Sequence, residues 1–193
     1  LAGDQLLPDT APMIAPADAL KELREGNRRF VSGETDAESL ARRSHRADLV
    51  GGQAPFAIIL ACSDSRVPVE MVFDSGFGDL FVIRVAGNIV APSQIGSIEF
   101  AAEQFGTRLV VVLGHTNCGA VTATLNELTL KGSHRSPNLR AIVDRVRPAV
   151  EPVLDKHRDD DSAALLRAAI RANIRASVEH LSHGSLILEK LLE

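Results

Sequence analysis

Three short apolar runs rich in β-branched residues stand in the middle of the chain. They are FAIILA at 56–61, LFVIRVA at 80–86 and RLVVVLG at 108–114. Continuous apolar runs of this length are typical of strands that are buried on both faces of a parallel sheet. A helical pattern, SQIGSIEFAAEQFG at 93–106, separates the second run from the third. This alternation predicts an α/β fold with a central, mainly parallel sheet of about four strands flanked by helices.

Helical patterns also precede and follow this central region. The segment ADALKELREGNRRFVSG at 17–33 has apolar residues near helical spacing and ends at a glycine, and a second helix is predicted at 37–50. We expect residues 1–15 to form a loose leader and 16–193 to form a single domain. A further helix is predicted to begin near Cys118, and the remainder of the chain is predicted to be helical, with breaks at Pro148, Pro152, Asp159–Asp161 and Gly184.

Composition limits the classes of protein to which the chain can belong. The 193 residues are 45% hydrophobic and 24% charged, which is ordinary for one globular domain. A net charge of -4 provides no general attraction to nucleic acid or to an anionic membrane. No apolar run approaches the roughly 20 residues of a membrane span. Two cysteines are too few for a disulfide scaffold, so we expect a cytoplasmic protein, and export after cleavage of a signal peptide stays open.

Polar clusters follow two of the predicted strands directly. Cys62-Ser63-Asp64-Ser65-Arg66 comes after the first apolar run, and His115-Thr116-Asn117-Cys118-Gly119 comes after the third. The carboxyl ends of parallel strands meet at one edge of a sheet, where such sheets bind ligands. Two thiolates and one imidazole fit zinc, and three protein ligands leave a fourth position open. Each cysteine alone is more typical of a small buried residue, but the three together favour a metal site.

Asp64 and Arg66 lie two residues apart in the first cluster. Their side chains can form a bidentate carboxylate–guanidinium pair beside the metal. An ionised carboxylate there can accept the proton of a zinc-bound hydroxide and aim its lone pair at an electrophile. The alternative is an ion pair with only a structural role.

The two clusters together resemble the signature of the β-class carbonic anhydrases, specifically the plant-like branch of bacterial type. The pattern is Cys62-x-Asp64-x-Arg66 followed by His115-x-x-Cys118-Gly119, and the resemblance extends from about Glu22 to about Leu188. It implies one Zn²⁺ per chain, held by Cys62, His115 and Cys118, with Asp64 and Arg66 orienting the nucleophile. The implied reaction is reversible hydration of carbon dioxide to bicarbonate and a proton by zinc-bound hydroxide.

The resemblance also implies residues that bind the substrate. Gln53 matches a glutamine that donates a hydrogen bond to the substrate, and Gly119 offers a backbone amide. Phe81, Ala86 and Phe100 match positions that line the apolar pocket for CO2. For the two aromatic residues, plain core packing is the alternative.

For assembly, the resemblance implies a homodimer or a tetramer of dimers with an N-terminal helical arm. The chain stops at Glu193, near where relatives begin a further edge strand, and we expect that strand to be missing. An inhibitory bicarbonate site with tryptophan and tyrosine anchors is not expected, since the chain has neither residue.

Three alternative functions remain: a carbon disulfide or carbonyl sulfide hydrolase with the same zinc site, a metal-free enzyme that uses a cysteine nucleophile paired with His115, and a zinc-stabilised interaction domain.

Overall fold

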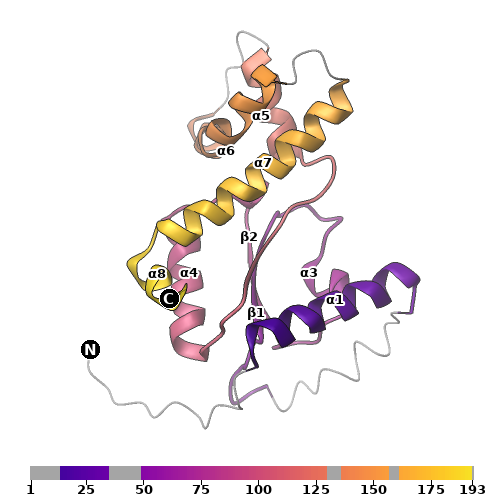
Figure 1. Ribbon diagram of the computed structural model, residues 1–193, viewed down its shortest axis with the longest axis vertical. Helices are drawn as coiled ribbons and strands as arrows, with labels where there is room; N and C mark the ends of the chain where they lie inside the picture. Colours follow the sequence, from indigo (N-terminus) through magenta and orange to yellow (C-terminus); the bar gives the residue numbers. More distant parts are fainter. Residues whose placement is uncertain (1–13, 35–48, 130–135, 157–160, 193) are drawn as a thin grey trace. The chain divides into compact units, whose positions relative to one another are not determined.

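The chain divides into two compact units. The computed structural model describes residues 14–34, 49–129, 136–156 and 161–192. Figure 1 shows the helices and strands in chain order. The first unit comprises Leu1–Ile59, Pro68–Val82 and Gly96–Val111, and the second comprises Leu60–Val67, Ile83–Ile95 and Val112–Glu193.

The three predicted strands form one sheet in the order β2-β1-β3. Backbone N–H groups of Phe56 and Val85 donate to the carbonyls of Asp79 and Ala61, at 2.8 and 3.0 Å. From the first of these bonds to the second, the residue numbers increase along both strands, so β1 and β2 are parallel. The predicted parallel sheet is confirmed, with three strands in the described part of the chain rather than about four. The strands are β1 (Ala57–Ala61), β2 (Leu80–Arg84) and β3 (Val110–Leu113).

In the first unit, helix α1 (Pro16–Ser32) packs against the short helix α3 (Val69–Val72). The predicted end of α1 at Gly33 is confirmed: this residue has φ 74° and its N–H bonds back to the last turn. The Asn27 side chain donates to the carbonyl of Val72 at 3.0 Å, and Arg29 forms an ion pair with the buried Asp74. These polar contacts fix the helix against the segment that follows α3.

The second unit is mainly helical. Helix α6 packs against both α5 and α7, and the short helical turn η1 contacts all three (Figure 1). A buried apolar cluster joins these helices to two of the predicted metal ligands, Cys62 and Cys118. The site is therefore anchored in the core of this unit. The elements of this unit are η1 (Ala86–Asn88), α5 (Gly119–Thr129), α6 (Pro137–Lys156), α7 (Ser162–His183) and α8 (Leu186–Leu192). Helix α4 (Pro92–Phe105) has residues in both units.

Helix α6 corrects the prediction of breaks at Pro148 and Pro152, because it continues through both prolines. Each proline removes one backbone hydrogen bond, to the carbonyls of Asp144 and Pro148. All three of these residues are exposed on one face, where water can satisfy the freed carbonyls. The opposite face carries the buried Val146 and holds the helix in place. The predicted breaks at Asp161 and at Gly184 are confirmed, because α7 begins after the first and ends before the second, while Asp159 and Asp160 lie outside the described residues.

Two further predictions concern residues at the margins of the described structure. The leader at 1–15 and the helix at 37–50 fall mostly outside the described residues.

Within the described part, none of the helices combines the length and the apolar character that crossing a bilayer requires.

Helix α7 begins at an N-cap, Asp161, whose carboxylate accepts hydrogen bonds from Ala163 N–H and Ala164 N–H at 2.8 and 2.9 Å. These bonds lower the pKa of Asp161. We expect Asp161→Ala to lower the melting temperature by a few degrees at neutral pH.

The pH dependence of this effect follows from the lowered pKa. The contribution of the cap is complete above the carboxyl pKa of the unfolded chain, about 3.9. It is lost as the pH falls through the lower pKa of folded Asp161. Calorimetry of the wild type, of Asp161→Ala and of the control Asp161→Asn, which keeps a hydrogen-bond acceptor, measures the melting temperatures across this pH range. A melting-temperature difference between the wild type and Asp161→Ala that persists unchanged in strong acid would contradict the prediction.

Candidate metal centre

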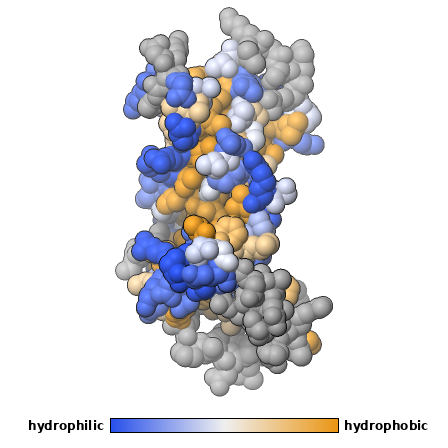
Figure 2. Space-filling view, turned by 90° about the vertical axis from the view of Figure 1, so that its right-hand side faces the viewer, coloured by the Kyte–Doolittle hydropathy of each residue, from blue (hydrophilic) through white to orange (hydrophobic). Residues whose placement is uncertain are grey.

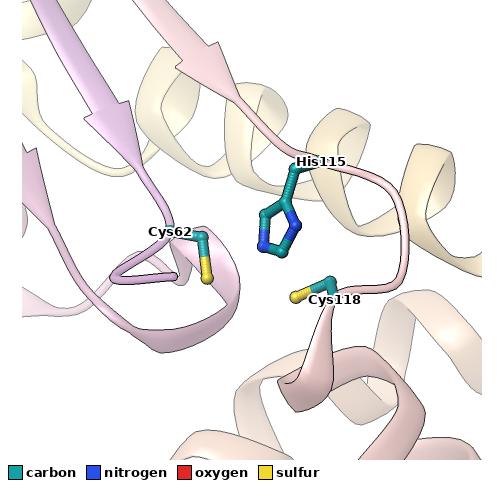
Figure 3. Close-up of side chains that lie close together, drawn as sticks. All are labelled: Cys62, His115 and Cys118. Carbon is teal, nitrogen blue, oxygen red and sulfur yellow. The ribbon is translucent and has the colours of Figure 1, made fainter. Parts of the chain in front are cut away.

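Three side chains with metal-binding atoms converge at the carboxyl ends of β1 and β3. Cys62 directly follows β1, His115 lies two residues after β3, and Cys118 immediately precedes α5. Their two sulfur atoms and a ring nitrogen all lie within 4.8 Å of one another. Figure 3 shows the three side chains pointing toward a common centre. The predicted convergence of these residues is therefore observed, and all three belong to the second unit.

His115 is oriented as a ligand. Its Nδ1 atom lies 2.9 Å from the carbonyl of Thr116, and this hydrogen bond assigns the ring proton to Nδ1. The lone pair of Nε2 is left available toward the sulfur atoms. Nε2 is buried and has no hydrogen-bond partner within the described residues. Burial of a polar nitrogen without a partner is unfavourable in free energy, and a metal ion at the centre of the cluster would bind this lone pair.

The two thiols are electrostatically coupled. The Cys118 thiol and the Gly87 N–H donate to the sulfur of Cys62, and these bonds hold the pKa of the Cys62 thiol below its usual range. The pKa of Cys118 is raised, because its thiol proton is held in the hydrogen bond to the Cys62 sulfur and because the thiol is buried. Two adjacent buried thiolates therefore need a cation between them. A divalent metal ion provides that charge and displaces both protons.

Asp64 and Arg66 form the predicted bidentate pair. Arg66 Nε and Nη2 each donate to one carboxylate oxygen at 2.8 Å, and the backbone N–H of Arg66 donates to Asp64 Oδ1 at 3.0 Å. These bonds hold the pKa of Asp64 well below its usual range. Asp64 Oδ2 lies 3.8 Å from His115 Nε2, so a carboxylate that is ionised at neutral pH borders the ligand cluster without belonging to it.

Arg84 and Gly87 support the site, and the sequence analysis did not single them out. Arg84 Nε donates to the carbonyl of Cys62 at 3.0 Å, and its Nη2 donates to the carbonyl of Asp64 at 2.6 Å. Gly87 N–H donates to Cys62 Sγ at 3.3 Å. Both residues lie at the carboxyl end of β2, the same sheet edge that carries the ligands. The sequence carries a signal for this support, a single arginine inside the second apolar run and a glycine directly after that run.

The predicted substrate-binding residues are distributed over both units. Gln53 lies exposed in the loop before β1, in the first unit. Phe81 and Phe100 also lie in the first unit, with ring centroids 6.3 Å apart, and Phe100 is 51% exposed. Ala86 begins η1 and Gly119 begins α5, both in the second unit with the metal ligands.

Comparisons with known proteins show what the chain is similar to. The family model for carbonic anhydrase matches residues 57–193. Carbonic anhydrase 2 of Mycobacterium tuberculosis is 46% identical over 142 residues, and carbonic anhydrase of Mycolicibacterium smegmatis is 43% identical over 141. Each match covers 72% of this chain and 66% of the relative, just under two thirds of its length. The solved structure of the β-carbonic anhydrase CcaA has a TM-score of 0.70 at 27% identity, covering 91% of this chain and 78% of that one.

Proposed function

Since this chain belongs to the β-carbonic anhydrase family, we propose that it catalyses the reversible hydration of carbon dioxide to bicarbonate and a proton. The observation that carries the proposal is the cluster of Cys62, His115 and Cys118 beside an ionised carboxylate paired with arginine. This arrangement offers three protein ligands and leaves one position for a small molecule, as catalytic zinc sites do.

The residues present fit a zinc ion. Two sulfur atoms and one imidazole nitrogen are ligands that zinc prefers, and the buried Nε2 of His115 has its lone pair available for a metal. Zinc bound there would supply a Lewis acid that brings the pKa of a water molecule toward neutrality. The family uses zinc, so the proposed cofactor is one Zn²⁺ per chain.

Asp64 would orient the attacking oxygen. Its carboxylate oxygens can only accept hydrogen bonds at any pH near neutrality, because Arg66 keeps the group ionised. A nucleophilic water or hydroxide that donates its hydrogen to Asp64 Oδ2 must direct a lone pair elsewhere, toward the carbon of CO2. Arg84 holds the carbonyl of Asp64 and so fixes the turn from which the carboxylate projects. The proton released by the reaction leaves to solvent buffer.

The substrate-binding residues extend this proposal. CO2 is apolar, and the apolar side chains proposed to retain it are Phe81, Ala86 and Phe100. Gln53 would donate a hydrogen bond to a substrate oxygen, and Gly119 would contribute its backbone N–H. The partial exposure of Phe100 supports this role over plain core packing.

The alternative functions receive less support. The relatives are named as carbonic anhydrases, which favours CO2 over carbon disulfide or carbonyl sulfide as the substrate. A metal-free cysteine nucleophile would leave two coupled buried thiols without the cation that their geometry suits. A zinc-stabilised interaction domain needs four protein ligands, whereas Asp64 is engaged by Arg66 beside the cluster.

Stopped-flow measurement of CO2 hydration tests the proposal. The full chain, confirmed to hold zinc, is expected to turn over CO2 rapidly at alkaline pH. The same preparation is assayed with carbon disulfide and carbonyl sulfide. Hydrolysis of either sulfur compound without CO2 hydration would contradict the proposed reaction and favour the hydrolase.

For assembly and location, the proposal is a cytoplasmic homodimer or tetramer of dimers. Figure 2 shows apolar residues among charged ones on the surface. Large apolar side chains with substantial exposure include Phe77 at 63% and Leu186 at 77%. Apolar side chains that are exposed in one chain can be covered in an oligomer.

Light scattering on the zinc-loaded protein is expected to give at least twice the chain mass of 20.7 kDa. Burial of exposed apolar side chains between subunits is the physical reason. The measurement is repeated over a range of protein concentrations, because weak dimers dissociate on dilution. A mass that equals that of a single chain at every concentration would contradict the proposed assembly.

A further inference from the structure

Two polar side chains of α7 are buried against the turn that follows β2. Asn173 and Ser177 are 3% and 5% exposed, and their spacing of four residues places them on the same face of the helix. Asn173 Nδ2 donates to the carbonyl of Gly87 at 2.8 Å, and Ser177 Oγ donates to the carbonyl of Asn88 at 3.0 Å. Burial of polar groups is unfavourable unless they are hydrogen-bonded, and both of these groups bond to one short stretch of backbone.

That stretch of backbone contacts a proposed metal ligand. Gly87 N–H donates to Cys62 Sγ at 3.3 Å, so Gly87 is bonded to the ligand on one side and to α7 on the other. The path from Asn173 to the sulfur therefore passes through a single residue. No side chain of Gly87 takes part, because both bonds use its backbone groups.

The turn has little freedom to move. Gly87 has φ 72° and Asn88 has φ 44°, a left-handed conformation that a non-glycine residue adopts at a cost. A Cβ atom on Gly87 would lie 2.9 Å from Ala120 Cβ, so the turn is also packed closely against α5. Ser177 bonds to Asn88, the strained residue, and helps to keep it in this conformation.

We propose that Asn173 and Ser177 are positioning residues that aim the Gly87 N–H at the sulfur of Cys62 and so strengthen metal binding. A hydrogen bond to a ligand sulfur fixes the direction of its lone pairs and tunes the charge that it donates to the metal. Helix α7 thereby acts on the metal centre through backbone groups, although it contributes no ligand. The inference rests on the zinc site of the proposed function but not on the reaction with CO2.

Metal binding to variants of the full chain tests the inference. Asn173→Asp keeps the size of the side chain but replaces the amide donor with a carboxylate that opposes the Gly87 carbonyl. Ser177→Ala removes the other donor. We expect the zinc dissociation constant, measured by competition with a chromophoric chelator, to rise about 10- to 100-fold for Asn173→Asp and less for Ser177→Ala. Cobalt-substituted protein should also show a changed sulfur-to-cobalt charge-transfer band.

A control variant separates positioning from general stability. Leu181 is buried one turn beyond Ser177 on the same helix, and its apolar side chain cannot donate a hydrogen bond to the turn after β2. Leu181→Ala should lower the stability of the fold while leaving the cobalt spectrum and the zinc affinity unchanged. If Asn173→Asp does not fold, Ser177→Ala decides by the same two readouts.

The other possible results separate the inference from the proposed function. An unchanged zinc affinity and cobalt spectrum in the folded variants would overturn the inference. So would an equal loss of affinity in Leu181→Ala, because that would indicate a purely structural effect. A wild-type chain that binds no zinc would refute both the inference and the proposed function. A wild-type chain that binds zinc but does not hydrate CO2 would refute the reaction alone, and the variants would still decide the inference.

Discussion

Replacement of His115 by alanine is expected to reduce the zinc content from about one ion per chain to a small fraction and to abolish CO2 hydration. The substitution leaves only Cys62 and Cys118, whose sulfur atoms would face each other with no third ligand. Loss of a direct ligand should weaken binding by more than the roughly 10- to 100-fold that an outer partner contributes. Metal analysis of the purified protein and a competition titration measure the effect.

A matched histidine controls for this substitution. His183 lies at the end of α7 with 68% of its side chain exposed, and His183→Ala should retain both zinc and activity. Removal of the Nε2 atom of His115 also removes a buried polar group that has no partner among the described residues. The free energy of unfolding of the metal-free protein should therefore change little in His115→Ala. Full zinc occupancy in the His115 variant would contradict the assignment of this ligand.

The sheet was predictable because its strands carry their own signal. β1 is buried at every position, and a run of five buried residues must be apolar throughout. The behaviour of α6 was not predictable from local rules. Proline at Pro148 and Pro152 is unfavourable within a helix, but whether the freed carbonyls face water depends on which side of the helix packs against the core. That information belongs to the tertiary structure.

The metal centre was predictable for a related reason. Cys62 and the His115–Cys118 segment each follow an apolar run, so the parallel topology alone brings them together. The supporting bonds to backbone atoms carry no such signal. Gly87 acts through its N–H and Asn173 binds a carbonyl, and neither interaction depends on a side-chain pair that a spacing pattern could show. Residues that act through the backbone of another segment become visible only in three dimensions.

Asp64→Asn is expected to lower kcat/KM for CO2 hydration by about 100-fold or more while zinc remains bound. The asparagine has nearly the same shape, but its amide nitrogen replaces one of the two oxygens that accept hydrogen bonds from Arg66. Two donors then face each other, so the bidentate pair is lost and the side chain is free to turn away from His115. The remaining oxygen is uncharged and a weaker acceptor for the hydrogen of the attacking oxygen.

A second aspartate–arginine pair provides the control for this variant. Asp144 lies 3.8 Å from Arg147 on α6 with 54% of its side chain exposed, and Asp144→Asn removes the same charge away from the ligand cluster. Stopped-flow rates and zinc content of both variants are measured together, so that loss of metal is distinguished from loss of orientation. If the zinc-loaded Asp64 variant turned over CO2 at the wild-type rate, the carboxylate would have only a structural role. A large loss confined to Asp64→Asn would instead show that the ionised carboxylate takes part in the reaction.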